Sequence, residues 1–142
     1  EKEKTKVGHV RVYREAGGNW SQVGADIDGE AEGDYFGTSV AMSADGTTIA
    51  IGAPADRLFG QQPGYVRVYR EADSNWRQIG ADIGGEAGKD QFGYSVAMSA
   101  DGNTIAIGAP IDGQGVRAGY VRVHRQAGGI WSQVFADIGG EA

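Results

Sequence analysis

Residues 36–54 read FGTSVAMSADGTTIAIGAP, and residues 92–110 read FGYSVAMSADGNTIAIGAP. This near-identity indicates a repeat array. Two other landmarks keep the same spacing: a glycine ahead of the VRV run at Gly8, Gly64 and Gly119, and a tryptophan at Trp20, Trp76 and Trp131. The period is therefore 56 residues and then 55. The one-residue difference falls between the GAP motif and the next VRV run, where a surface loop tolerates a deletion.

Composition narrows the class of protein. The chain has 25 glycines, no cysteine and a formal net charge of −6. Without cysteine it forms no disulfide or thiolate metal site. Nucleic acids and anionic membrane surfaces are bound by clustered Lys and Arg, so the acidic balance argues against both as partners. No apolar stretch approaches the roughly 20 residues that span a membrane, and membrane insertion is not expected.

Each repeat contains four short runs with the pattern of β-strands. In the last repeat the runs are Phe92 to Met98, Thr104 to Gly108, Tyr120 to Arg125 and Trp131 to Phe135. Asp-Gly between the first two runs favours a tight hairpin turn. Alternation along the third run predicts that Val66 and Val68 face a buried layer. Four antiparallel strands in a repeat of this length are typical of one β-propeller blade.

The order of FG, SVA, DG, IAIGAP, GYVRVYR and a Trp-containing strand resembles the FG-GAP repeat, from Gly8 to Ala142. The resemblance implies blades like those in the seven-bladed propeller of integrin α subunits and in many bacterial and algal surface proteins. It places the FG run innermost and the Trp strand outermost. The implied division is a tail or linker at 1–7, an outer half-blade at 8–34, a first full blade at 35–90 and a second at 91–142. The resemblance also implies an extracellular or cell-surface location.

About two and a half blades cannot close a propeller, which needs about four to eight. Each blade hides its apolar face only against a neighbour. We therefore expect closure by oligomerisation or within a longer array, with copies of the chain or further repeats of a parent chain as partners. The half-blade lacks its inner strands, so its third strand exposes an unpaired edge that invites strand addition.

An acidic stretch is the one candidate metal site. Carboxylates alternate at Asp26, Asp28, Glu30, Glu32 and Asp34, and calcium binds through several such oxygens. We take Asp26, Asp28, Glu30 and Asp34 as the candidate ligands. The later copies keep only part of this pattern, at Asp82, Glu86 and Asp90 and then at Asp137 and Glu141. The resemblance also implies a DxDxDG-type calcium loop between the FG and GAP strands. In this sequence that loop is shortened to SADG. Asp45 and Asp101 are therefore interpreted as turn-forming residues.

The three tryptophans allow two interpretations. Each could stack on a sugar in a carbohydrate-binding propeller with one site per blade, whose partners would be glycans or surface proteins. Alternatively, Trp20, Trp76 and Trp131 pack between blades and recur because the blade recurs. Packing is favoured, because no constant set of Asp, Asn or Arg accompanies the tryptophans as a sugar site would need.

Catalytic patterns are missing from the sequence. His9 and His124 are the only histidines, and neither lies in a pattern that resembles a nucleophile and its base. The favoured function is a non-enzymatic, extracellular structural or adhesion module that self-associates into a ring or filament, without a required cofactor. The alternatives are a lectin-like propeller and an enzyme, since the fold alone does not decide activity.

Overall fold

The computed structural model describes residues 7–55, 63–85, 90–110 and 119–140. In these ranges the chain forms strands and turns and no helix, which confirms the predicted all-β class. No helix in the same ranges is therefore long and apolar enough to cross a membrane. Residues 1–6, almost all of the expected tail, lie outside the described residues.

Two antiparallel five-stranded sheets form the full blades. The first contains β5 (Ser39–Met42), β6 (Thr48–Ala53), β7 (Tyr65–Ala72), β8 (Asn75–Gln78) and β9 (Ile83–Gly84). The second contains β10 (Ser95–Met98), β11 (Thr104–Ala109), β12 (Tyr120–Ala127), β13 (Ile130–Gln133) and β14 (Ile138–Gly139). In each sheet the strands pair in chain order, and the last short strand pairs with the beginning of the third. The sheets are consistent with partial propeller blades, as expected.

The outermost strand differs from the predicted run Trp131 to Phe135. The observed outer strand consists of two short pieces, β13 and β14. Phe135 lies in the break between them and has a φ of +64°. Gly80 has the corresponding place in the first full blade, with a φ of +72°. A residue in this left-handed region cannot continue a strand, so the outer edge of each blade bends between its two short pieces.

The N-terminal segment contains only the outer part of a blade. Its strands are β1 (His9–Val10), β2 (Tyr13–Ala16), β3 (Asn19–Gln22) and β4 (Ile27–Asp28). β1 pairs with β4, and β2 pairs with β3. Within the described ranges no strand occupies the place that β6 has beside β7, so one edge of β1 and β2 is open.

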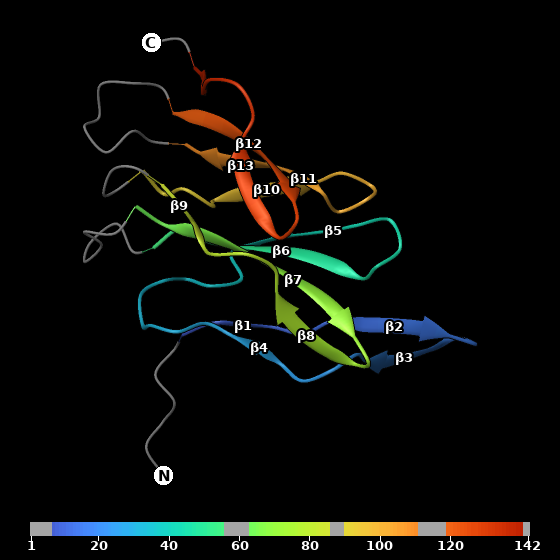
Figure 1. Cartoon of the computed structure of the whole chain (residues 1–142). Coiled ribbons are helices and arrows are strands. Elements are labelled where there is room, and N and C mark those ends of the chain that lie inside the picture. Colours follow the sequence, from blue (N-terminus) through green and yellow to red (C-terminus); the bar gives the residue numbers. More distant parts are fainter. Residues whose placement is uncertain (1–6, 56–62, 86–89, 111–118, 141–142) are drawn as a thin grey trace.

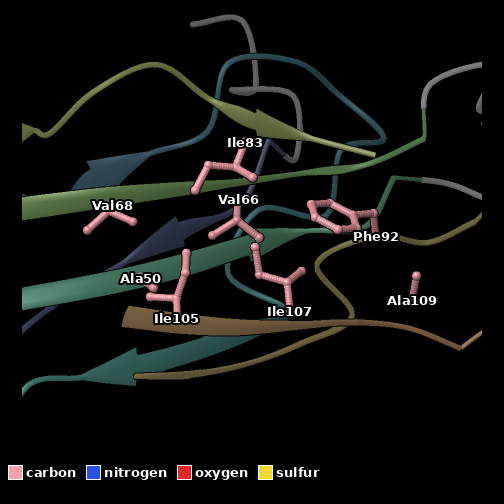
Figure 2. Close-up of a cluster of buried hydrophobic side chains, with 8 residues drawn as sticks. All are labelled: Ala50, Val66, Val68, Ile83, Phe92, Ile105, Ile107 and Ala109. Carbon is pink, nitrogen blue, oxygen red and sulfur yellow. The ribbon is translucent and has the colours of Figure 1, made fainter. Parts of the chain in front are cut away.

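The three units follow one another in chain order, with the half-blade at one end and the second full blade at the other (Figure 1). One apolar cluster lies between the half-blade and the first full blade, and another lies between the two full blades. Figure 2 shows the second cluster, in which Val66 and Val68 of β7 face Ile105 and Ile107 of β11. Both valines are buried, as the alternation predicted. The core of this protein therefore lies between its blades.

The SADG turn joins the two innermost strands of each full blade. The Asp45 carboxylate accepts hydrogen bonds from Ser43 Oγ at 2.8 Å and from the backbone N and Oγ1 of Thr47 at 3.0 and 2.8 Å. These bonds lower the pKa of Asp45 from 3.8 to about 2, because they stabilise its ionised form. Asp101 accepts matching bonds in the second full blade. Both aspartates therefore form turns.

We predict that Phe92→Ala lowers the free energy of unfolding by about 3–5 kcal/mol, because it removes a fully buried ring from the contact between blades. Tyr94→Ala is the matched control, since that ring is exposed on the same segment and its loss should change stability by no more than about 0.5 kcal/mol. Urea unfolding followed by circular dichroism measures both variants. Equal stability of the two would contradict the interblade core.

We also predict a distinct acid response for Asp45→Asn. The folded-state pKa of Asp45 lies below the unfolded value, so the ionised carboxylate contributes stability above pH 3.8, and this contribution is lost as the pH falls toward about 2. The variant should show a shallower loss of unfolding free energy across that window than the unmodified chain. Urea titrations at a series of pH values test this, and parallel curves would argue against it.

Candidate functional site

The candidate calcium ligands face different partners in the structure. Asp26 accepts hydrogen bonds from Arg11 Nε at 3.0 Å and from Gln22 Nε2 at 2.7 Å. The arginine contact lowers the pKa of Asp26. Asp28 is exposed on β4, where its backbone lies opposite His9. These two carboxylates therefore belong to the outer surface of the half-blade.

The other two candidate ligands contact the first full blade. Glu30 forms an ion pair with Nη2 of Arg67 at 2.9 Å. Asp34 accepts a hydrogen bond of 2.9 Å from the Tyr65 hydroxyl. Among the described residues, no three His, Cys, Asp or Glu side chains are close enough to share an ion. Glu86 and Glu141 lie outside the described ranges, and calcium binding by the acidic stretch stays a prediction.

A buried arginine of the first full blade pairs with two acidic residues, Glu30 and Asp82. Arg67 Nε and Nη2 donate to the two carboxylate oxygens of Asp82 at 2.8 and 3.0 Å. Its guanidinium also lies over the Tyr65 ring, 4.9 Å from the ring centre. A buried charge is costly unless it is paired and hydrogen-bonded, and Asp82 together with Glu30 supplies that pairing. The acidic residues here act as counterions of an arginine.

The second full blade repeats this arrangement. Arg122 donates to both oxygens of Asp137 at 2.7 and 3.0 Å and lies 4.8 Å from the centre of the Tyr120 ring. The Tyr120 hydroxyl donates to Asp90 at 2.8 Å. Burial, followed by this hydrogen bond, raises the pKa of Tyr120. Hydrogen bonding by Arg122 lowers the pKa of Asp137.

Sequence reasoning missed this arginine cluster. The signal was present, because an arginine in each VRV run is followed 15 residues later by an aspartate. The alternation along each VRV run predicts burial for the face that carries the valines and not for the face that carries the arginine. Arg67 and Arg122 are nevertheless buried on that face.

Two of the three tryptophans connect neighbouring blades. Trp76 Nε1 donates to the Val23 carbonyl at 2.8 Å, and Trp131 Nε1 donates to the Ile79 carbonyl at 3.0 Å. Each indole also packs against the apolar cluster on its side of the preceding blade. The structure therefore places Trp76 and Trp131 as interblade packing residues. Trp20 is 70% exposed, and no blade precedes it within the described ranges.

The histidines form no catalytic pair in the described part of the chain. His9 is exposed at the beginning of β1. Both ring nitrogens of His124 are buried without a hydrogen-bond partner. Burial, and then the nearby Arg122 charge, lower the pKa of His124. This ring has the place of Tyr69 in the preceding repeat, which fits a structural role.

Comparison with known protein families identifies a repeat. The family model described as the FG-GAP repeat matches residues 23–69 and 84–123, which together exceed half of the chain. Each matched segment begins in the outer strands of one unit and ends in the third strand of the next blade. A search of curated proteins finds no sequence match. The matched segments include most residues of the two interblade apolar clusters but neither Trp76 nor Trp131.

We predict that Trp76→Phe lowers the free energy of unfolding by about 1–3 kcal/mol, because the Val23 carbonyl loses its donor while most of the ring remains. Trp20→Phe should leave stability within about 0.5 kcal/mol of the unmodified chain, because that indole is mostly exposed. Chemical unfolding monitored by circular dichroism measures the difference. A larger loss of stability in Trp20→Phe than in Trp76→Phe would contradict a stabilising role for the hydrogen bond between Trp76 and Val23.

Proposed function

The chain belongs to the FG-GAP repeat family, and on that premise we propose that it is a non-enzymatic, extracellular structural or adhesion module. Repeats of this family occur mostly in extracellular or surface proteins and generally form structural or adhesion modules. The proposal extends these family properties to this chain. It assigns the chain a mechanical role, in which successive blades build a stiff scaffold.

One observation carries the proposal: the polar and aromatic groups that could do chemistry are repeated and used within the scaffold. Trp76 and Trp131 donate to carbonyls of the preceding unit. Arg67 and Arg122 each hold the aspartate 15 residues later. A catalytic site would be expected to break the repeat symmetry with a unique polar cluster. The repeated use of the same groups supports a scaffold.

We further propose that the module self-associates through the open edge of the half-blade. In the first full blade the Glu71 amide donates to the Thr47 carbonyl, toward β6. Because strand amides alternate in direction, the Tyr69 amide points the same way. Tyr13 is the counterpart of Tyr69 on β2, where no strand is paired on that side within the described ranges. An unpaired row of this kind favours strand addition.

A second copy offers the same edge, so the contact can be isologous. Each half-blade has two strand positions, one formed by β1 with β2 and the other by β3 with β4, so two half-blades would together fill the four strand positions of a blade. Such pairing satisfies backbone groups at the edge and covers the open side of each half-blade. It would also be the first step toward the ring or filament that a set of incomplete blades requires.

We predict a mass above the 14.9 kDa monomer that rises with concentration, measured by light scattering after size-exclusion chromatography. Tyr13→Pro removes one amide donor from the open edge and should shift the population toward monomer. Tyr13→Ala keeps the amide and serves as the control, which should still associate.

Circular dichroism verifies that both variants fold, and each sample is measured with calcium and with chelator. A folded chain that stays monomeric at all concentrations would refute self-association. Equal masses of Tyr13→Pro and Tyr13→Ala would refute the edge contact. A mass that falls only in chelator would instead support calcium at the acidic stretch.

A further inference from the structure

The contact between the two full blades contains a histidine where the contact between the half-blade and the first full blade contains a tyrosine. His124 of β12 pairs directly with Ile105 of β11. Tyr69 of β7 pairs in the same way with Ile49 of β6. Residues directly opposite each other in antiparallel strands share one face of the sheet. Ile105 packs toward the first full blade (Figure 2), so the imidazole of His124 faces that blade too.

A small cavity lies beside this ring, between the two full blades. It has a volume of about 340 Å³, and its lining includes Ile83 and Gly84 of the first full blade and His124 and Trp131 of the second. The equivalent cavity beside Tyr69 has a volume of about 260 Å³. The smaller cavity is in keeping with the greater length of a phenol ring. The imidazole is therefore part of the contact between blades and fills its place less completely.

The nitrogens of this imidazole have no hydrogen-bond partner. Within the described residues, they are the buried side-chain polar atoms that the structure leaves unpaired. The ring's neighbours across β11 and β13, Ile105 and Gln133, carry no charge. A buried polar group without a partner is costly, and a buried charge without a partner is costlier. Position 124 thus accommodates a neutral ring and penalises a protonated one.

The charged groups around the ring do not offset that penalty. Arg122, on the same strand, opposes a second positive charge. Asp137 favours protonation, but both of its oxygens accept hydrogen bonds from Arg122, at 2.7 and 3.0 Å. Asp82 of the first full blade lines the same cavity, and its oxygens accept hydrogen bonds from Arg67 at 2.8 and 3.0 Å. Burial, and then the charge of Arg122, keep the pKa of His124 below 6.5.

We propose that His124 makes the contact between the two full blades sensitive to acid. Protonation places a second positive charge beside Arg122 in a buried contact, and separation of the blades at this point lets water reach the ring. The contact between the half-blade and the first full blade has Tyr69 at the same place and does not respond. Acid therefore loosens one contact and leaves the other closed, which gives a stiff scaffold a hinge. This property is independent of the edge association proposed above.

Stability at different pH values tests the role of the imidazole. The pKa of His124 in the folded chain lies below 6.5, so the unfolded chain takes up the proton first and stability is lost as the pH falls through 6.5. Urea unfolding between about pH 7.5 and 5 should show that the ratio of folded to unfolded chain falls roughly tenfold more in the unmodified chain than in His124→Tyr. Parallel losses in these two proteins would overturn the proposal.

The chain offers a matched control and a measurement that needs no variant of His124. His9 is exposed on β1, outside this contact, and His9→Gln should keep the acid response of the unmodified chain. Ring-proton NMR of His9→Gln follows His124 alone, and its imidazole should titrate only below pH 6.5. Titration of that ring at or above pH 6.5 would contradict the proposal, whatever the stability of His124→Tyr.

Hydrogen exchange locates the loosening within the chain. At about pH 5 the amides of β9 and β11, which lie at the contact between the full blades, should exchange roughly tenfold faster in the unmodified chain than in His124→Tyr. The amides of β4 and β6, at the other contact, should exchange equally in both proteins. Comparison at one pH removes the direct effect of pH on exchange. Equal exchange of β11 in the two proteins, or faster exchange at both contacts, would refute a local hinge.

Discussion

Burial of each blade against the next is the constraint on which the structure depends. A single twisted sheet of this size cannot cover its own apolar residues. Ile105 and Ile107 of one blade are buried by Val66 and Val68 of the blade before it (Figure 2). A Cβ added at Gly85 would lie 2.7 Å from Phe92 Cβ, so the glycine allows the two blades to come this close. The composition follows from this packing, because glycines recur where two blades come nearest.

Charge is arranged around the same contacts. Arg67 is enclosed by a tyrosine ring and by carboxylates from two different segments, Asp82 on its own blade and Glu30 on the connection from the half-blade. Such pairs add little net stability compared with apolar residues of similar size, but an unpaired buried guanidinium would be costly. We infer that the cluster mainly fixes how neighbouring units are aligned. Much of the acidity of the chain thus has a structural explanation.

Much of the fold could be predicted from the sequence, since the repeat reports the same strand pattern more than once. The alternation in YVRVYR identified Val66 and Val68 as core residues, and Asp-Gly identified the hairpin turns. The break in the outermost strand was missed, because Phe135 is apolar and continues the strand pattern although its backbone is left-handed. The glycines at the same place in the other copies, Gly24 and Gly80, are the sequence signal of that break. The pairing of distant acids was also missed. Alternate carboxylates on a loop do not reveal that an arginine on another strand separates them.

The two interfaces between blades are built from corresponding residues of successive repeats, such as Phe36 and Phe92 or Trp76 and Trp131. Duplication or deletion of the 56 residues that separate the start of segment 36–54 from the start of segment 92–110 would add or remove one whole repeat. Each contact between blades in the product would again place a phenylalanine against a glycine, as Phe92 lies against Gly85, so no compensating mutation would be needed. The packing therefore permits a change in the number of blades without a change in the residues of any one blade.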